Sequence, residues 1–302
     1  MDLTTSPKQP LSARYGGAWK VQALHASSFC STWRADGAVG TVFVKSVPAH
    51  QEHILAAEAD GLRAIAATKT VTVPEVVGCW TDTDQNLTVL ALEWLDFQPM
   101  QSDAFGHRLG QALAALHRAP VLNGAGRFGW YRDNMLGGTL QRNRWSQEGG
   151  MTGWLAFFGG ERLGLMREKL AALGATHDLI ANIDQVIKVL PTFFDDGYVP
   201  QASLVHGDLW SGNWGSLAHG TPVIFDPAVS ISDREAELAM MALFGKPPQG
   251  FWPAYREVAG LAPGYQRRVG LYQLYHVLNH ELLFGGYARA AMVIMEQLLT
   301  GR

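Results

Sequence analysis

Cysteine is scarce in this chain: its 302 residues contain only two, Cys30 and Cys79. Two isolated cysteines provide neither a disulfide framework nor the paired ligand spacing of a structural zinc site. The ten histidines are scattered along the sequence, so they do not form such a site either. We therefore expect a fold that depends on its hydrophobic core, without a structural zinc ion or disulfide bridges.

Long apolar runs are also missing, and so is an excess of basic residues. No run approaches the roughly 20 apolar residues of a membrane-spanning helix, and the first residues, MDLTTSPKQPLSARYGG, lack the apolar core of a signal peptide. We expect a soluble, cytoplasmic protein with no membrane partner. Lys and Arg total 24 against 27 Asp and Glu, and no basic cluster resembles a nucleic-acid footprint. We therefore expect no nucleic-acid partner.

The order of patterns along the chain predicts two lobes. GTVFVKSV (40–47) is rich in β-branched and aromatic residues, and NLTVLALEWL (86–95) is an apolar run of strand length. Apolar positions in 53–67 have helical spacing, and helical patterns dominate from about residue 103. We expect an α+β fold with a β-rich N-terminal lobe at 1–95, a mostly helical C-terminal lobe at 96–302 and a ligand cleft between them.

Three polar residues follow short apolar runs in the second half of the chain. The stretch SLVHGDLWSGNWG places Asp208 and Asn213 after one strand-like run, and PVIFDPA places Asp226 at the end of the next. Alone, each aspartate is more often a cap or turn residue than a catalytic one. If the two runs pair as a hairpin, however, all three side chains lie in one small space.

The three residue types suit one kind of chemistry. A carboxylate and an amide oxygen are hard ligands for magnesium, which takes one or two protein oxygens and fills its other positions with water and phosphate. Asn213 and Asp226 are the candidate ligands, and Asp208 is placed to accept a proton from an attacking hydroxyl. These are the parts that phosphoryl transfer requires.

The same strings resemble a known family. H-G-D-x-x-x-x-N followed by an apolar-x-D is similar to the catalytic and metal loops of the protein-kinase-like fold, in the form found in small-molecule kinases. HGDLWSGN, PVIFDPA and REAELAMMALFG resemble the fructosamine (ketosamine) kinases in particular, as do FGWYRDNMLGGTLQRN and WLAFFGGERL. The resemblance covers most of residues 20–290. It implies ATP- and Mg²⁺-dependent transfer of the γ-phosphate to a sugar hydroxyl of a ketosamine, and hence a role in protein deglycation.

The resemblance also implies roles for residues of the predicted N-terminal lobe. Lys45, in VFVKSV, would hold the α- and β-phosphates of ATP and be braced by Glu58. Glu93 and Leu95, in the connector between the lobes, would offer backbone groups to adenine. By itself, Lys45 is read more simply as a strand lysine that reaches solvent, and Glu58 equally as part of a solvated helix face or of an ion pair.

In the predicted C-terminal lobe, the resemblance implies that Asp208 orients or deprotonates the acceptor hydroxyl. Asn213 and Asp226 would carry magnesium. Trp210, on the same loop as Asp208, would pack against the sugar or the substituent on its amine.

Two other functions remain as alternatives. The first is an aminoglycoside- or choline-type kinase that uses another acceptor, which the catalytic loop does not distinguish. The second is a catalytically silent nucleotide-binding protein, favoured by the expected phosphate loop, LHASSFCSTWRADG (24–37), which lacks the usual glycines. The sequence leaves open which ketosamine is used, whether it is free or protein-bound, whether ATP or GTP is preferred, and the oligomeric state.

Overall fold

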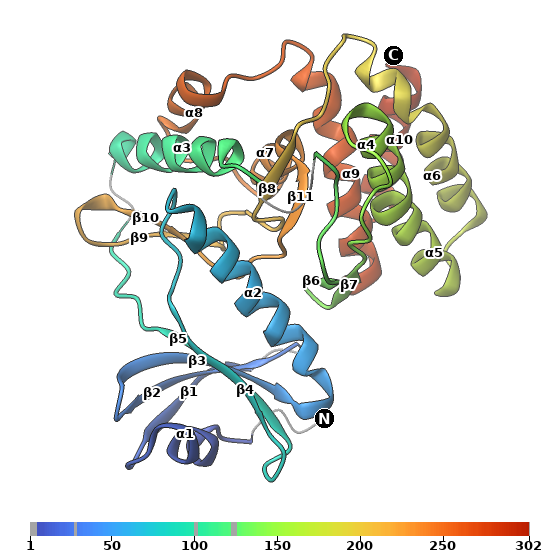
Figure 1. Ribbon diagram of the computed structural model, residues 1–302. Helices are drawn as coiled ribbons and strands as arrows, with labels where there is room; N and C mark the ends of the chain where they lie inside the picture. Colours follow the sequence, from blue (N-terminus) through green and yellow to red (C-terminus); the bar gives the residue numbers. More distant parts are fainter. Residues whose placement is uncertain (1–4, 27–28, 100–101, 122–125, 302) are drawn as a thin grey trace.

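The computed structural model describes residues 5–26, 29–99, 102–121 and 126–301. A five-stranded antiparallel sheet forms the N-terminal part, in the order β1-β2-β3-β5-β4, and the remainder is mostly helical (Figure 1). The predicted α+β fold class is therefore confirmed. The N-terminal elements are α1 (Lys8–Tyr15), β1 (Lys20–Ala26), β2 (Ser31–Gly37), β3 (Gly40–Pro48), η1 (Ala49–Gln51), α2 (Glu52–Thr68), β4 (Val76–Asp82) and β5 (Leu87–Glu93).

The sheet presents two different faces because successive side chains of a strand point to opposite sides. In β3, Val42 and Val44 lie in a core cluster with Leu11 of α1. Phe43 packs against another cluster, which includes Leu55 of α2. Lys45 follows the same alternation as Phe43, so the pleat directs it toward α2.

Helix α2 runs between the sheet and the helical part of the molecule (Figure 1). Its apolar stripe, Leu55, Leu62 and Ile65, is buried in one core cluster with residues from both sides of residue 95. Gly61 lets the helix approach the chain after β10, because a Cβ there would lie 3.2 Å from both Pro227 and Val229. The division into lobes at residue 95 stays a prediction.

The C-terminal part packs around two core clusters. No helix of the described residues is long and apolar enough to cross a membrane. The helices of the C-terminal part are α3 (Ser102–Arg118), α4 (Gly150–Ala156), the π-helix η2 (Phe157–Gly164), α5 (Leu165–Ala172), α6 (His177–Val189), η3 (Leu190–Phe194), η4 (Ala218–Gly220), α7 (Arg234–Met241), α8 (Phe251–Ala259), α9 (Tyr265–Phe284) and α10 (Ala288–Thr300). Its strands are β6 (Asn134–Leu136), β7 (Thr139–Gln141), β8 (Ala202–Val205), β9 (Trp214–Ser216), β10 (Pro222–Ile224) and β11 (Ser230–Asp233).

The predicted hairpin between the strand before Asp208 and the strand before Asp226 is wrong. Strand β8 pairs with β11, and β10 pairs with the intervening strand β9. A short connection joins β9 to β10, so their pairing closes a smaller loop than a β8–β10 hairpin would. In the sequence, the β9–β10 hairpin therefore lies between β8 and β11, which pair with each other. Both aspartates still leave their strands toward the same region.

Helices α3 and α8 pack closely through a glycine. A Cβ at Gly110 would lie 2.5 Å from the carbonyl oxygen of Phe251 and 3.1 Å from the amide nitrogen of Tyr255. We predict that Gly110→Ala lowers the free energy of unfolding by about 1–3 kcal/mol, because the helices must separate. Gly160→Ala is the control, since a Cβ there meets nothing within 4 Å. Thermal unfolding of the two variants checks this, and equal melting temperatures would contradict it.

Candidate active site

Lys45 lies between two carboxylates where the sheet meets the metal loop, the segment 225–229 after β10. Its Nζ is 2.8 Å from Oε1 of Glu58 on α2 and 2.7 Å from Oδ1 of Asp226. Lys45 is 7% exposed, whereas the Asp226 side chain is 45% exposed. The predicted Lys45–Glu58 pair is present in the structure, and Asp226 joins it from the other part of the chain.

Charge and burial oppose each other at this lysine. Burial alone would lower the pKa of Lys45, but the charges of Glu58 and then Asp226 outweigh it, and the pKa lies above its usual value. Burial raises the pKa of Glu58, and the ammonium of Lys45 opposes that rise. Lys45 therefore stays charged and acts as the positive centre of the site.

Asp208 and Asn213 lie at the two ends of a tight turn after β8, the catalytic loop (206–213). The Asn213 side-chain amide donates to the Asp208 carbonyl oxygen at 2.7 Å and to its carboxylate at 3.4 Å. Burial, reinforced by the nearby charge of Asp226, raises the pKa of Asp208 to about 8. The structure thus brings Asp208, Asn213 and Asp226 into one electrostatic neighbourhood, as the sequence predicts.

His206 joins the catalytic loop to the metal loop. Its Nε2 lies 2.8 Å from the carbonyl oxygen of Phe225, and its Nδ1 accepts the backbone N–H of Asp208 at 3.3 Å. Burial lowers the pKa of His206, so the ring is neutral and the proton is on Nε2, which donates to Phe225. The His206 carbonyl also accepts the N–H of Ala228 at 2.8 Å.

Gly207 is anchored from beneath by Glu237 of α7. Its backbone N–H donates to Oε1 of Glu237 at 2.7 Å. The other oxygen of this buried carboxylate lies 2.7 Å from Nε2 of His117, whose Nδ1 lies 2.8 Å from the Tyr255 hydroxyl. Glu237 fits the sequence pattern of an acidic helix start, but nothing in the sequence identifies His117 or Tyr255 as its partners.

A cleft of about 250 Å³ lies between the sheet and the metal loop. Glu93 and Leu95 line it, as predicted for the connector, and the backbone N–H of Glu93 is engaged by the Glu75 carbonyl at 2.9 Å. Asp226 lines the same cleft, so the cleft reaches the charged site. The other lining residues are Leu24, Phe43, Pro74, Leu92, Trp94, Phe97 and Phe225.

Trp210 lies on the catalytic loop and is 38% exposed. Its ring covers Gly212, where a Cβ would lie 2.4 Å from the ring. The indole is thus held against its own loop with one part open to solvent. The predicted phosphate loop, 24–37, includes residues 27–28, which lie outside the described residues.

The donor set fits Mg²⁺. Because the amide nitrogen of Asn213 donates to Asp208, its oxygen remains available to a cation, and Asp226 supplies a partly exposed carboxylate. Within the described ranges, no group of three or more His, Cys, Asp or Glu residues could hold a metal. An ion that takes two protein oxygens and completes its shell with water and phosphate matches this arrangement.

Comparisons with known proteins show which family the chain resembles over most of its length. The chain matches the family model described as fructosamine kinase over residues 6–301. It is 40% identical over 262 residues to a probable ketoamine kinase of Synechocystis sp., covering 85% of this chain and 82% of that protein. It is 34% identical over 263 residues to a chloroplastic protein-ribulosamine 3-kinase of Oryza sativa subsp. indica, covering 86% of this chain and 73% of that protein.

Solved structures show the same architecture. The structure of a putative fructosamine-3-kinase from Thermobifida fusca superposes with a TM-score of 0.81 at 31% identity, covering 97% of this chain and 98% of that one. A thermostable mutant of the aminoglycoside phosphotransferase APH(4)-Ia, in a ternary complex with ADP and hygromycin B, gives 0.64 at 15% identity and covers 97% of both chains. At this low identity, the second likeness shows the fold alone.

Gly207 permits the close approach of the two loops. Its φ is +86°, and a Cβ would lie 2.1 Å from the Ala228 carbonyl oxygen. We predict that Gly207→Ala destabilises the protein by about 3 kcal/mol or more, since backbone strain and a collision add. Gly174→Ala is the matched control, because its φ is +80° but a Cβ meets nothing within 4 Å. Chemical denaturation measures both, and a Gly207 variant no less stable than the Gly174 variant would refute the collision.

Proposed function

Because the chain belongs to the fructosamine kinase family, we propose that it transfers the γ-phosphoryl group of ATP to a sugar hydroxyl of a ketosamine. The observation that supports this most is the meeting of Asp208 and Asn213 with Asp226, itself paired to Lys45. One proton acceptor, two oxygen ligands and one fixed ammonium are the groups that phosphoryl transfer uses.

We assign nucleotide binding to the 250 Å³ cleft and to the lobe at 1–95. Adenine would lie between the apolar walls, with backbone groups of Glu93 and Leu95 at its edge. Lys45 would hold the α- and β-phosphates, and Glu58 would keep its ammonium in place. Mg²⁺, when bound through Asn213 and Asp226, would neutralise phosphate charge.

The lobe at 96–302 would supply the acceptor side of the reaction. Asp208 would hold the acceptor hydroxyl in line with the γ-phosphate and take its proton. Its elevated pKa, about 8, is suited to holding that proton, since the basicity of a carboxylate rises with its pKa. Trp210 presents a flat, partly exposed ring on the same loop, to which the apolar face of a sugar or amine substituent would pack.

The relatives named above include a ketoamine kinase and a protein-ribulosamine 3-kinase. We therefore propose ketosamines, free or attached to protein, as the substrate class of this chain. Phosphorylating such adducts would be one step of deglycation, because the bond between sugar and amine must be broken separately, and the dependence on ATP suits the cytoplasm.

A test of this function measures ATP consumption with Mg²⁺ and a synthetic fructosyl-lysine derivative, beside ribulosyl-lysine, choline and aminoglycoside acceptors. We expect turnover with a ketosamine, and we expect Asp208→Asn to reduce kcat by about 10²–10⁴, the usual contribution of a general base. Affinity for Mg-ATP should change little, because Asp208 is not assigned to the metal. Turnover only with an aminoglycoside or choline would overturn the substrate class, and near-normal kcat in the variant would overturn the role of Asp208.

Asp226 should act through the metal instead. We predict that Asp226→Ala weakens nucleotide binding about tenfold or more in the presence of Mg²⁺, and much less in its absence, because the lost group is a cation ligand. Isothermal titration calorimetry with and without Mg²⁺ distinguishes the two conditions. Asp184→Ala is the control, since that carboxylate forms an exposed ion pair with Arg167 on the surface. Equal losses with and without Mg²⁺ would argue against ligation.

A further inference from the structure

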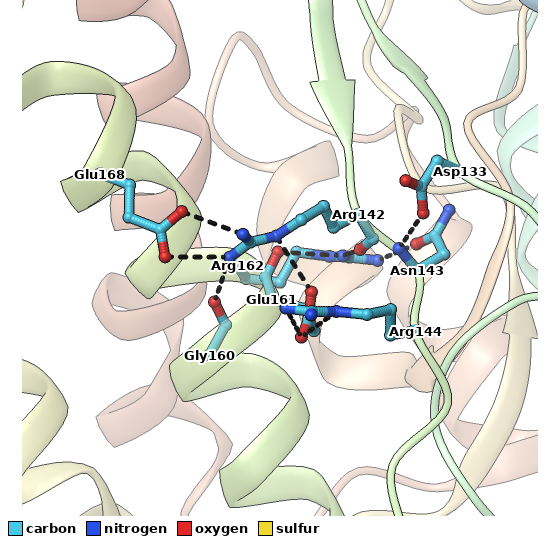
Figure 2. Close-up of polar contacts among 8 residues, drawn as sticks. All are labelled: Asp133, Arg142, Asn143, Arg144, Gly160, Glu161, Arg162 and Glu168. Atoms are coloured by element: carbon cyan, nitrogen blue, oxygen red, sulfur yellow. Dashed lines mark hydrogen bonds and ion pairs between the residues drawn. The ribbon is translucent and has the colours of Figure 1, made fainter. Parts of the chain in front are cut away.

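A chain of buried polar side chains connects the π-helix η2 with the metal loop. Its members, the amide relay, are Arg162 of η2, Asn143, Asn134 and Gln141, and each is at most 4% exposed. The part around Arg162 and Asn143 is shown in Figure 2. None of the four belongs to the catalytic loop, and no role for any of them follows from the sequence.

The donors and acceptors at the two ends of the relay fix its direction. A guanidinium only donates hydrogen bonds, so the Asn143 atom 2.7 Å from Nη2 of Arg162 is its oxygen, Oδ1. The amide nitrogen of Asn143 then donates to Oδ1 of Asn134 at 3.0 Å and to the Arg132 carbonyl at 3.2 Å. This leaves the Asn134 nitrogen to donate to the backbone carbonyl of Val229 at 2.7 Å. Because a carbonyl only accepts, the arginine at one end and the carbonyls at the other require the same orientation of both amides.

Gln141 forms a branch of the relay. Its amide nitrogen donates to Oδ1 of Asn134 at 2.8 Å and to the Ala228 carbonyl at 3.2 Å. Its oxygen accepts the Tyr275 hydroxyl at 2.9 Å. The relay therefore ends on two consecutive carbonyls, those of Ala228 and Val229, just after Asp226 and Pro227.

These carbonyls belong to a segment that other contacts hold from the opposite side. Ala228 donates its N–H to the His206 carbonyl at 2.8 Å, and its own carbonyl faces Gly207. Asp226 has a φ of +60°, an uncommon backbone conformation for a residue other than glycine. The surrounding contacts must therefore maintain the path of the chain at this position.

Stability alone does not explain a buried arginine here. Within the described residues, the hydrogen bonds of Arg162 go to neutral oxygens: the carbonyls of Arg142 and Glu161 and the amide of Asn143. Burial lowers the pKa of Arg162, so desolvation opposes its charge, and the rings of Phe157 and Tyr275, at 4.4 and 5.8 Å, offset part of that cost. What arginine provides toward the relay is a group that donates to the Asn143 oxygen and cannot accept.

We propose that Arg162, Asn143, Asn134 and Gln141 are positioning residues for the Mg-nucleotide site. They hold the carbonyls of Ala228 and Val229 and thereby set the direction in which Asp226 leaves the metal loop. This inference rests on the proposed function, since Asp226 acts there as the cation ligand.

Two adjacent substitutions test the relay. Asn143→Asp keeps the acceptor for Arg162 at nearly the same volume, but it removes the donor to Asn134. Arg142→Gln is the matched control, because the side chain of Arg142 forms ion pairs with Glu161 and Glu168 (Figure 2), whereas the relay uses only its backbone carbonyl. Both variants lose interactions of the same cluster, and only the first interrupts the relay.

We expect Asn143→Asp to weaken binding of Mg-AMP-PNP, a non-hydrolysable ATP analogue, about tenfold by calorimetry, comparable to the loss of a group that holds a metal ligand in place. The Mg²⁺ concentration for half-maximal binding should rise, and amide hydrogens in 225–231 should exchange faster in the nucleotide-free protein. In turnover, KM for ATP should rise more than kcat falls. Arg142→Gln should match the wild type in each measurement.

Unchanged Mg-AMP-PNP affinity and unchanged exchange in Asn143→Asp would overturn the proposal, even with a lower melting temperature. Equal effects in Arg142→Gln would overturn it too, since they would indicate a general role of the cluster in stability. If Asn143→Asp does not fold, Asn134→Asp replaces it, because this change removes only the donor to Val229. Absence of nucleotide binding by the wild type would contradict the proposed function instead, while hydrogen exchange would still test the relay.

Discussion

The site depends on the close approach of two backbone segments, the catalytic loop after β8 and the metal loop after β10. Gly207 lies against the Ala228 carbonyl, and His206 bonds to both Phe225 and Ala228. These contacts leave no space for a side chain at Gly207. Because they are made by backbone atoms and one neutral imidazole, they fix the loops without adding a charge. A carboxylate enters this frame only from beneath, where Glu237 accepts the N–H of Gly207.

Charge balance is the second constraint. Lys45 pairs with Glu58 and Asp226 at once, so one positive charge lies between two carboxylates. The balance is incomplete, because the pKa of Asp208 is still raised, to about 8, by burial and by Asp226. A cation at Asp226 would relieve this repulsion and would compete with Lys45 for the same carboxylate. The excess negative charge of the site would favour a bound cation. The phosphates of a nucleotide would then balance the charge of that cation.

Much of the site was predictable because its residues follow strands or lie in regular elements. Lys45 comes from a strand, Glu58 from an amphipathic helix, and Asp208 directly after an apolar run, so local pattern placed them in elements, while the resemblance to a family supplied the roles of Lys45 and Glu58. The pairing of β8 with β11 was not predictable in this way, since four very short strands leave several pairings of similar local quality. His117 and Tyr255 were not identified because His117 lies far along the chain from both Glu237 and Tyr255, which it contacts. The relay residues are closer in sequence, but the carbonyls on which they end are not.

The relay illustrates a more general limit of sequence reasoning. An asparagine in a loop usually forms a local turn, and nothing in the order of residues shows that Asn134, which pairs with Gln141 across the β6–β7 hairpin, also accepts from Asn143 beyond the end of β7. The role of each amide depends on its orientation, because its nitrogen donates and its oxygen accepts. A neighbour that can only donate or only accept decides that orientation. Arg162 has that role because it can never accept a hydrogen bond. Arg162 lies in a π-helix, whose turn is wider than that of an α-helix, so side chains along it follow other directions than they would in an α-helix. Its hydrogen bonds through Asn143 and Asn134 to the Val229 carbonyl connect this irregular helix to the segment that carries Asp226.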